Sequence, residues 1–72
     1  MSSVFVHPSH AAAALRQSPL SALRKLSIQE TEASVMILGR VNSYYLKQLA
    51  QETVMPALNG RALVNRVTVV GA

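Results

Sequence analysis

The stretch VMILGRVNSYYLKQLAQETV, residues 35–54, decides the fold. Its first seven residues are mostly apolar on both faces of an extended chain, which predicts a central or doubly covered strand. From residue 44 onward the apolar residues recur at helical spacing, and Asn42 or Ser43 can cap the helix N-terminus. Pro56 disfavours helix at the residue before it, so we expect the helix to end near Val54. A central strand thus leads directly into an amphipathic helix.

Gly39 lies inside this strand, on the face that it shares with Val35, Ile37 and Val41 by the two-residue period. A glycine weakens a strand unless another part of the molecule must approach its backbone closely. We therefore expect a helix to pack closely over Gly39.

Shorter elements are predicted on both sides of the central stretch. Ser9 is a suitable N-cap for an Ala-rich helix over residues 9–17, and Ser18-Pro19 starts either one helical turn or a plain linker. Apolar and polar residues alternate over residues 24–30 and again over residues 62–70, which predicts two strands. The first should form an antiparallel hairpin with the central strand, and a right-handed helical crossover would make the last strand parallel to it.

Together these elements predict an α+β fold, an αββαβ two-layer sandwich with two helices on one face of a three-stranded mixed sheet. We expect a flexible N-terminal lead over residues 1–8 and a single domain over residues 9–72. With 72 residues and no Cys, the chain has a small, disulfide-free core, so its stability should be modest.

Three motifs and the order of the elements resemble the BON domain, a small bacterial module named from osmotically induced and nodulation-associated proteins. The motifs are VMILGRV, NSYYLKQLAQ and LVNRVTVV. The family pattern has a hydrophobic strand leading to Gly and Val, a polar cap, an Ala-containing helix and a final strand containing Asn. Gly39, Val41 and Asn65 match structural positions of this pattern, and Gly60-Arg61 departs from the usual Gly-Val. The resemblance covers roughly residues 15–70.

The resemblance implies a non-enzymatic module of the bacterial stress response that binds phospholipid membranes or other proteins. The sequence lacks the basic start and long apolar run of a secretory signal, and it has no stretch of about 20 apolar residues that could cross a bilayer. We therefore expect a cytoplasmic location.

The sequence contains few of the residue types that catalysis requires. The three acidic residues are all Glu, there is no Cys, and no phosphate-binding glycine motif is present. His7 and His10 are spaced so that they could share a metal, but we interpret them as solvated because no third ligand is nearby. We expect no enzymatic activity, no metal and no cofactor.

The sheet face that the helices leave uncovered is the candidate binding site. Strand alternation predicts aliphatic side chains rimmed by cations there: Lys25, Met36, Leu38, Arg40, Val64 and Arg66. With a net charge of +4, such a face suits an anionic membrane surface or a protein partner, and the plainer alternative is a tolerated surface patch. The same aliphatic side chains predict a homo-oligomer.

A nucleic-acid-binding domain is the second interpretation, and it rests on charge alone. Modules that read single-stranded RNA usually present aromatic side chains on the sheet, whereas Tyr44 and Tyr45 are predicted in the helix.

Overall fold

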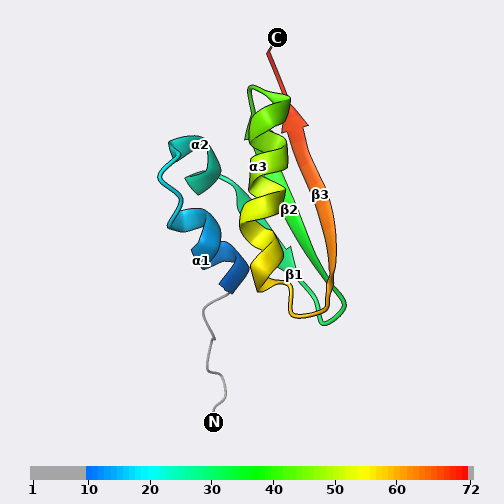
Figure 1. The fold of residues 1–72 in the computed structure, drawn as a ribbon. Coiled ribbons are helices and arrows are strands. Elements are labelled where there is room, and N and C mark those ends of the chain that lie inside the picture. The colour runs from blue at the N-terminus through cyan, green and yellow to red at the C-terminus, as the bar shows by residue number, and fades with distance from the viewer. Residues whose placement is uncertain (1–9, 72) are drawn as a thin grey trace.

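The computed structural model describes residues 10–71 and shows helices packed on one face of a three-stranded sheet (Figure 1). The elements are, in order, α1 (His10–Arg16), α2 (Ser21–Arg24), β1 (Ser27–Glu30), β2 (Ser34–Val41), α3 (Tyr44–Val54), the 3-10 helix η1 (Met55–Ala57) and β3 (Ala62–Val69). This arrangement confirms the predicted α+β class and mixed sheet, with α2 as an additional one-turn helix. The lead predicted over residues 1–8 lies outside the described residues.

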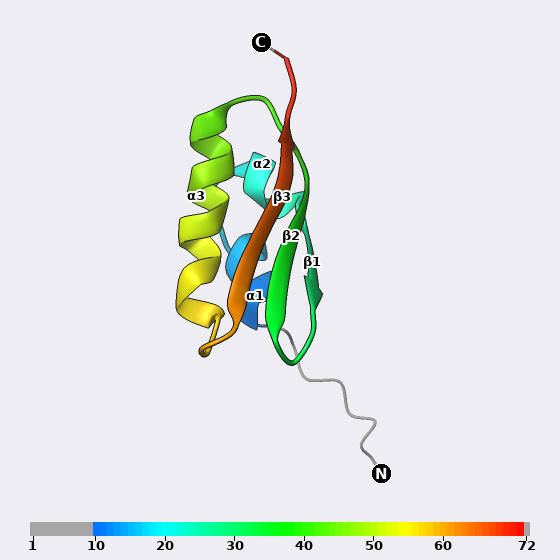
Figure 2. The ribbon, with the colours of Figure 1, turned by 90° about the vertical axis from the view of Figure 1, so that its right-hand side faces the viewer.

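β2 is the central strand of the sheet, as predicted. The strand order is β1-β2-β3, with β1 antiparallel to β2 and β3 parallel to it. Ile37 of β2 is paired with Ile28 of β1 on one side and with Asn65 of β3 on the other. In Figure 2 the sheet faces the viewer, and the helices lie behind it and to its left.

The hydrophobic core fills the space between the helices and one face of the sheet. Its buried members, all aliphatic, are Ala11, Leu15, Leu23, Val35, Ile37, Val41, Ala50, Val54 and Val67. The spacing of the buried residues follows the type of element. They are four residues apart on the helices α1 and α3, and two residues apart at Val35 and Ile37 on the strand β2. Burying one such Leu, Ile or Val side chain contributes about 1.5–3 kcal/mol, which makes this layer the main source of stability.

Local signals set both ends of α3. The Ser43 hydroxyl oxygen accepts a hydrogen bond of 3.2 Å from the Leu46 backbone N–H, so Ser43, and not Asn42, is the N-cap. At the other end α3 stops at Val54, as predicted, and Pro56 lies within the following 3-10 turn. Because Pro56 has no N–H and restricts the residue before it, the regular helix cannot continue.

Gly39 faces a side chain of the α2–β1 link, so the prediction that a helix packs over it is wrong. Gly39 has φ +136°, and a Cβ atom there would lie 2.6 Å from Leu26 Cδ2. Ser27 is paired with Leu38, so extending the register by one residue places Leu26 opposite Gly39. Leu26, in the short link after α2, supplies all three of the heavy atoms nearest to that Cβ position.

Two predicted boundaries also need correction. The first strand begins at Ser27 and not at residue 24, because Arg24 ends α2 and Lys25 is its helical C-cap. The turn of helix after Pro19 begins only at Ser21, since the Ser18 hydroxyl accepts a hydrogen bond from the Leu20 N–H and holds the chain in a bend before it.

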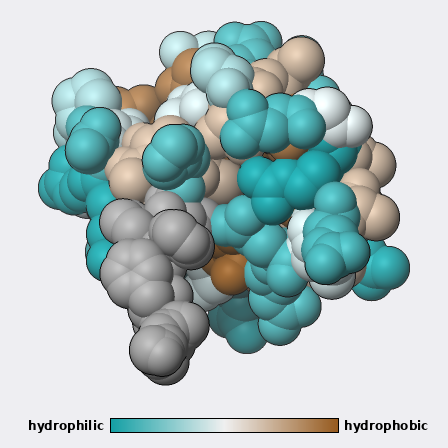
Figure 3. Space-filling view, turned by 90° about the horizontal axis from the view of Figure 1, so that it is seen from below, coloured by the Kyte–Doolittle hydropathy of each residue, from teal (hydrophilic) through white to brown (hydrophobic). Residues whose placement is uncertain are grey.

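Arg61 holds the connection between α3 and β3. Its Nε donates to the Leu58 carbonyl oxygen at 2.8 Å, and its Nη2 donates to the Ala57 carbonyl oxygen at 3.1 Å. Its Nη1 forms a salt bridge of 2.6 Å with Glu30 at the end of β1. This arginine, which departs from the BON pattern, thus ties the connection to the opposite edge strand. Seen from below, this end of the molecule is mostly hydrophilic, with small apolar patches (Figure 3).

Candidate functional site

The open face is the side of the sheet that points away from the helices (Figure 2). The strand register arranges its side chains in rows that cross the sheet. The rows are Gln29–Met36–Val64, then Ser27–Leu38–Arg66, then Arg40–Thr68. The structure therefore brings five of the predicted site residues onto one surface: Met36, Leu38, Arg40, Val64 and Arg66.

The aliphatic part of the open face is a shallow band. Met36, Leu38 and Val64 are each half-buried, because neighbouring side chains in the rows cover part of their surface. Arg40 and Arg66 are both exposed. Arg66 is paired with Leu38 across the sheet, and Arg40 lies in the next row along β2. The open face thus combines an aliphatic band with two exposed cations beside it.

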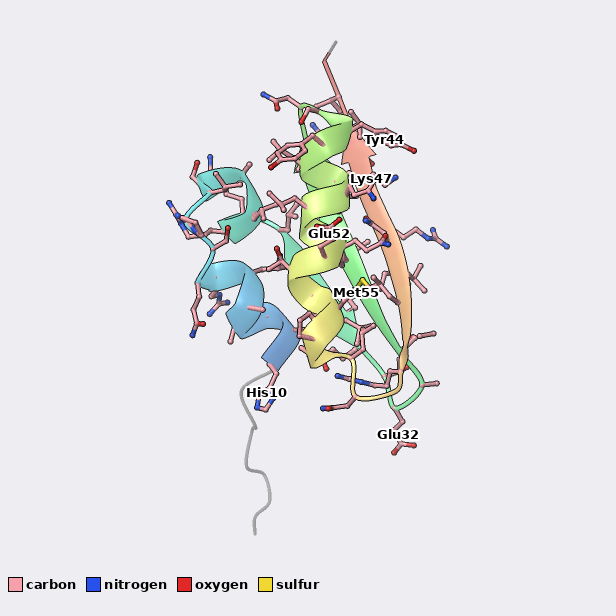
Figure 4. All side chains as sticks on the ribbon, in the orientation of Figure 1. His10, Glu32, Tyr44, Lys47, Glu52 and Met55 are labelled. Carbon is pink, nitrogen blue, oxygen red and sulfur yellow. The ribbon has the colours of Figure 1, made fainter. Side chains whose placement is uncertain are left out.

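No carboxylate of the described residues lies on the open face. Glu30 is engaged by Arg61, Glu32 lies in the β1–β2 turn, and Glu52 lies on α3 (Figure 4). Because the charged side chains that residues 10–71 place on the open face are positive, its electrostatic potential favours an anionic partner.

Lys25 is not part of the open-face strands, contrary to the sequence prediction. It is exposed, with φ −90° and ψ −5°, and its N–H donates to the Leu23 carbonyl oxygen as the C-cap of α2. The alternation of strand side chains therefore does not extend back to Lys25.

Asn65 joins β3 to α3. Its Nδ2 donates to the Lys47 carbonyl oxygen at 3.0 Å and to Gln51 Oε1 at 3.4 Å. Its Oδ1 accepts a hydrogen bond of 3.1 Å from the Val67 N–H. Val41, the other strand residue of the motif, is only 4% exposed and belongs to the core.

The Val67 N–H points to the outer edge of the sheet. The N–H groups of Ala62 and Val70 donate to the carbonyl oxygens of Ala33 and Val41, so the even-numbered residues of β3 face β2. The odd-numbered residues, Val67 among them, therefore direct their backbone groups outward. Asn65 thus supplies a partner for a group that the sheet itself leaves without one.

A second apolar surface, which the sequence analysis did not assign to a site, lies where α3 begins and β3 ends. Tyr44 is 73% exposed, Tyr45 69%, Val69 38% and Val70 40%. We call this surface the upper end, because it lies at the top of Figure 1. The signal in the sequence is the pair of adjacent tyrosines, which stand in the polar part of an amphipathic helix where packing does not require them.

The described residues offer no metal centre and no membrane-spanning helix. Residues 10–71 contain no group of three or more His or Glu side chains that could hold a metal ion, and His7 lies outside them. None of the helices in this range combines the length and apolar character needed to cross a bilayer. Comparison of the chain with protein-family models, with curated proteins and with solved structures finds no significant match.

Proposed function

We propose that this chain is a non-enzymatic interaction module of the BON type whose open face binds an anionic phospholipid surface. The observation that carries the proposal is the composition of that face. A band of aliphatic side chains adjoins two exposed arginines, and no carboxylate of the described residues shares the face.

Two energetic contributions support this partner. A cation close to an anionic bilayer contributes about 1 kcal/mol, so Arg40 and Arg66 together provide a useful attraction. Removing apolar area from water adds about 25 cal/mol per Å², although Met36, Leu38 and Val64 have only part of their surface left to bury. Binding should therefore be moderate, reversible and sensitive to salt.

Vesicle co-sedimentation tests the proposal. The whole chain should bind vesicles that contain phosphatidylserine and not vesicles of phosphatidylcholine alone, and raised salt should release it. Arg40→Glu combined with Arg66→Glu should abolish binding. The matched control is Arg16→Glu combined with Lys25→Glu, which changes the net charge equally at exposed positions off the open face.

An equal loss of binding in both double variants would contradict a role of the open face, because net charge alone would then explain it. Equal binding to neutral and anionic vesicles, or binding to neither, would remove anionic lipid as the partner and leave a protein partner. Tight, salt-sensitive binding of single-stranded RNA without vesicle binding would favour the nucleic-acid interpretation instead.

A further inference from the structure

The fold brings the two segments of the upper end, which are distant in the sequence, to the same end of the molecule. Val69 is paired with Val41 at the end of β2, and the Val70 N–H donates to the Val41 carbonyl oxygen at 2.8 Å. Only Asn42 and Ser43 separate Val41 from Tyr44. The first turn of α3 and the last residues of β3 therefore form one end of the molecule (Figure 1).

The side chains at the upper end suit the boundary between water and lipid. A tyrosine has an apolar ring and a hydroxyl that prefers water, which is why tyrosines concentrate at membrane interfaces. Val69 and Val70 add aliphatic surface at the same end of the molecule, Val69 on the helix side of the sheet and Val70 on the open face, and both remain more than a third exposed in the free protein. None of these four side chains contributes to the buried core.

The charges around the upper end favour an anionic bilayer. Lys47 Nζ lies 6.0 Å from the centroid of the Tyr44 ring, and Arg40 belongs to the last row of the open face before Val41. Glu32 lies at the opposite end of the molecule, and Glu52 follows Tyr45 along α3 by about 10 Å at the helical rise (Figure 4). A cation thus lies close to Tyr44, and Glu52 lines the same hollow on α3 as the two tyrosines but about two helical turns beyond Tyr45.

We infer that the upper end enters the headgroup region of the bilayer, so that the module binds tilted, with the first turn of α3 and the end of β3 leading. This inference rests on the proposed function and adds an orientation to it. Arg40 and Thr68 form the row of the open face that adjoins the upper end, so both surfaces can contact one membrane. Tyr44 and Tyr45 then lie at headgroup depth, and Lys47 lies within reach of the lipid phosphates.

Single tryptophans test the orientation, because the chain contains no Trp of its own. Tyr45→Trp reports on the upper end. Met55→Trp is the matched control, since Met55 is 50% exposed just beyond the other end of α3. On phosphatidylserine-containing vesicles, the tryptophan at position 45 should shift its emission to the blue and be quenched by brominated lipid. The tryptophan at position 55 should do neither.

The double variant Tyr44→Ala with Tyr45→Ala provides a second measurement. We expect it to bind the same vesicles about tenfold more weakly, which requires only partial burial of the two rings. Its thermal unfolding should remain close to that of the parent, because both side chains are exposed.

Each outcome decides between the two proposals. If vesicles bind the protein but the tryptophan at position 45 is neither shifted nor quenched, the orientation is wrong and the proposed function stands. A signal from position 55 in place of position 45 also overturns the orientation. If the parent chain binds no anionic vesicle, the proposed function fails, and the orientation fails with it.

Discussion

At Gly39, Leu26 occupies the space that a side chain would need. The backbone there has φ +136°, a conformation that L-residues rarely adopt, and an added Cβ would lie 2.6 Å from Leu26 Cδ2. Strain and overlap therefore act at the same position, which explains why a glycine stands in the middle of an otherwise aliphatic strand.

We expect Gly39→Ala to lower the free energy of unfolding by about 1–3 kcal/mol, from backbone strain and overlap combined. Gly60→Ala is the matched control, because Gly60 has φ +83° but no atom within 4 Å of its added Cβ. Urea denaturation should show a larger loss at Gly39 than at Gly60. Stability equal to the parent for Gly39→Ala would contradict the close contact with Leu26.

At the scale of single elements, the attachment of α3 to the sheet depends on more than apolar packing. Asn65 lies on an edge strand and reaches the backbone of α3 through Lys47. A side-chain amide at this position fixes how far α3 can slide along β3, which the aliphatic contacts alone do not specify.

Asn65→Ala should destabilise the protein by about 1–3 kcal/mol, because it leaves the Val67 N–H and the Lys47 carbonyl oxygen without the side-chain partner they have now. Gln51→Ala should cost less, since it removes only the contact of 3.4 Å. Thermal unfolding of the two variants provides the comparison. A loss at Gln51 equal to that at Asn65 would show that the bond to the helix backbone is unimportant.

Those element boundaries that are set by nearby residues could be predicted from the sequence. Ser43 and Pro56 act within one turn of the ends of α3, so the extent of this helix follows from local chemistry. The start of β1 could not be predicted in this way. In the sequence, Arg24 and Lys25 continue the alternating pattern of the strand. In the structure, Arg24 is the last residue of α2 and Lys25 is its C-cap, and the position of this turn depends on how Leu23 packs in the core.

The candidate site also contains some features that local sequence patterns predict and others that they do not. Residues of the open face on β2 and β3 could be predicted because a period of two fixes the face once a strand is recognised. The contact between Gly39 and Leu26 depends on the register of the hairpin, and the position of the end of β3 beside the start of α3 depends on the parallel pairing of β3. The direction of both pairings could be predicted from the order of the elements, but their register could not, because no local pattern specifies it.

At the scale of the whole molecule, the two partners that we propose for the open face should respond to salt in opposite ways. Anionic lipid would be attracted by Arg40 and Arg66, whereas a second copy would bring the same cations toward one another. Screening by salt weakens the first interaction and relieves the repulsion in the second.

We therefore expect the free protein to self-associate through the band of Met36, Leu38 and Val64, and more strongly as salt is raised, while vesicle binding declines. Sedimentation velocity over a range of salt concentrations measures the first trend, and co-sedimentation with vesicles measures the second. Leu38→Lys should suppress self-association at every salt concentration. A monomer at all salt concentrations would exclude this use of the open face.

The bond between Asn65 and Val67 has a consequence for solubility. β3 is an eight-residue outer strand without proline, and such an edge invites strands from other molecules to extend the sheet into fibres. An incoming strand would need the outward N–H groups along this edge, and the Val67 N–H is already occupied by Asn65. The amide that anchors α3 thus also interrupts the template on which a cross-β aggregate would grow.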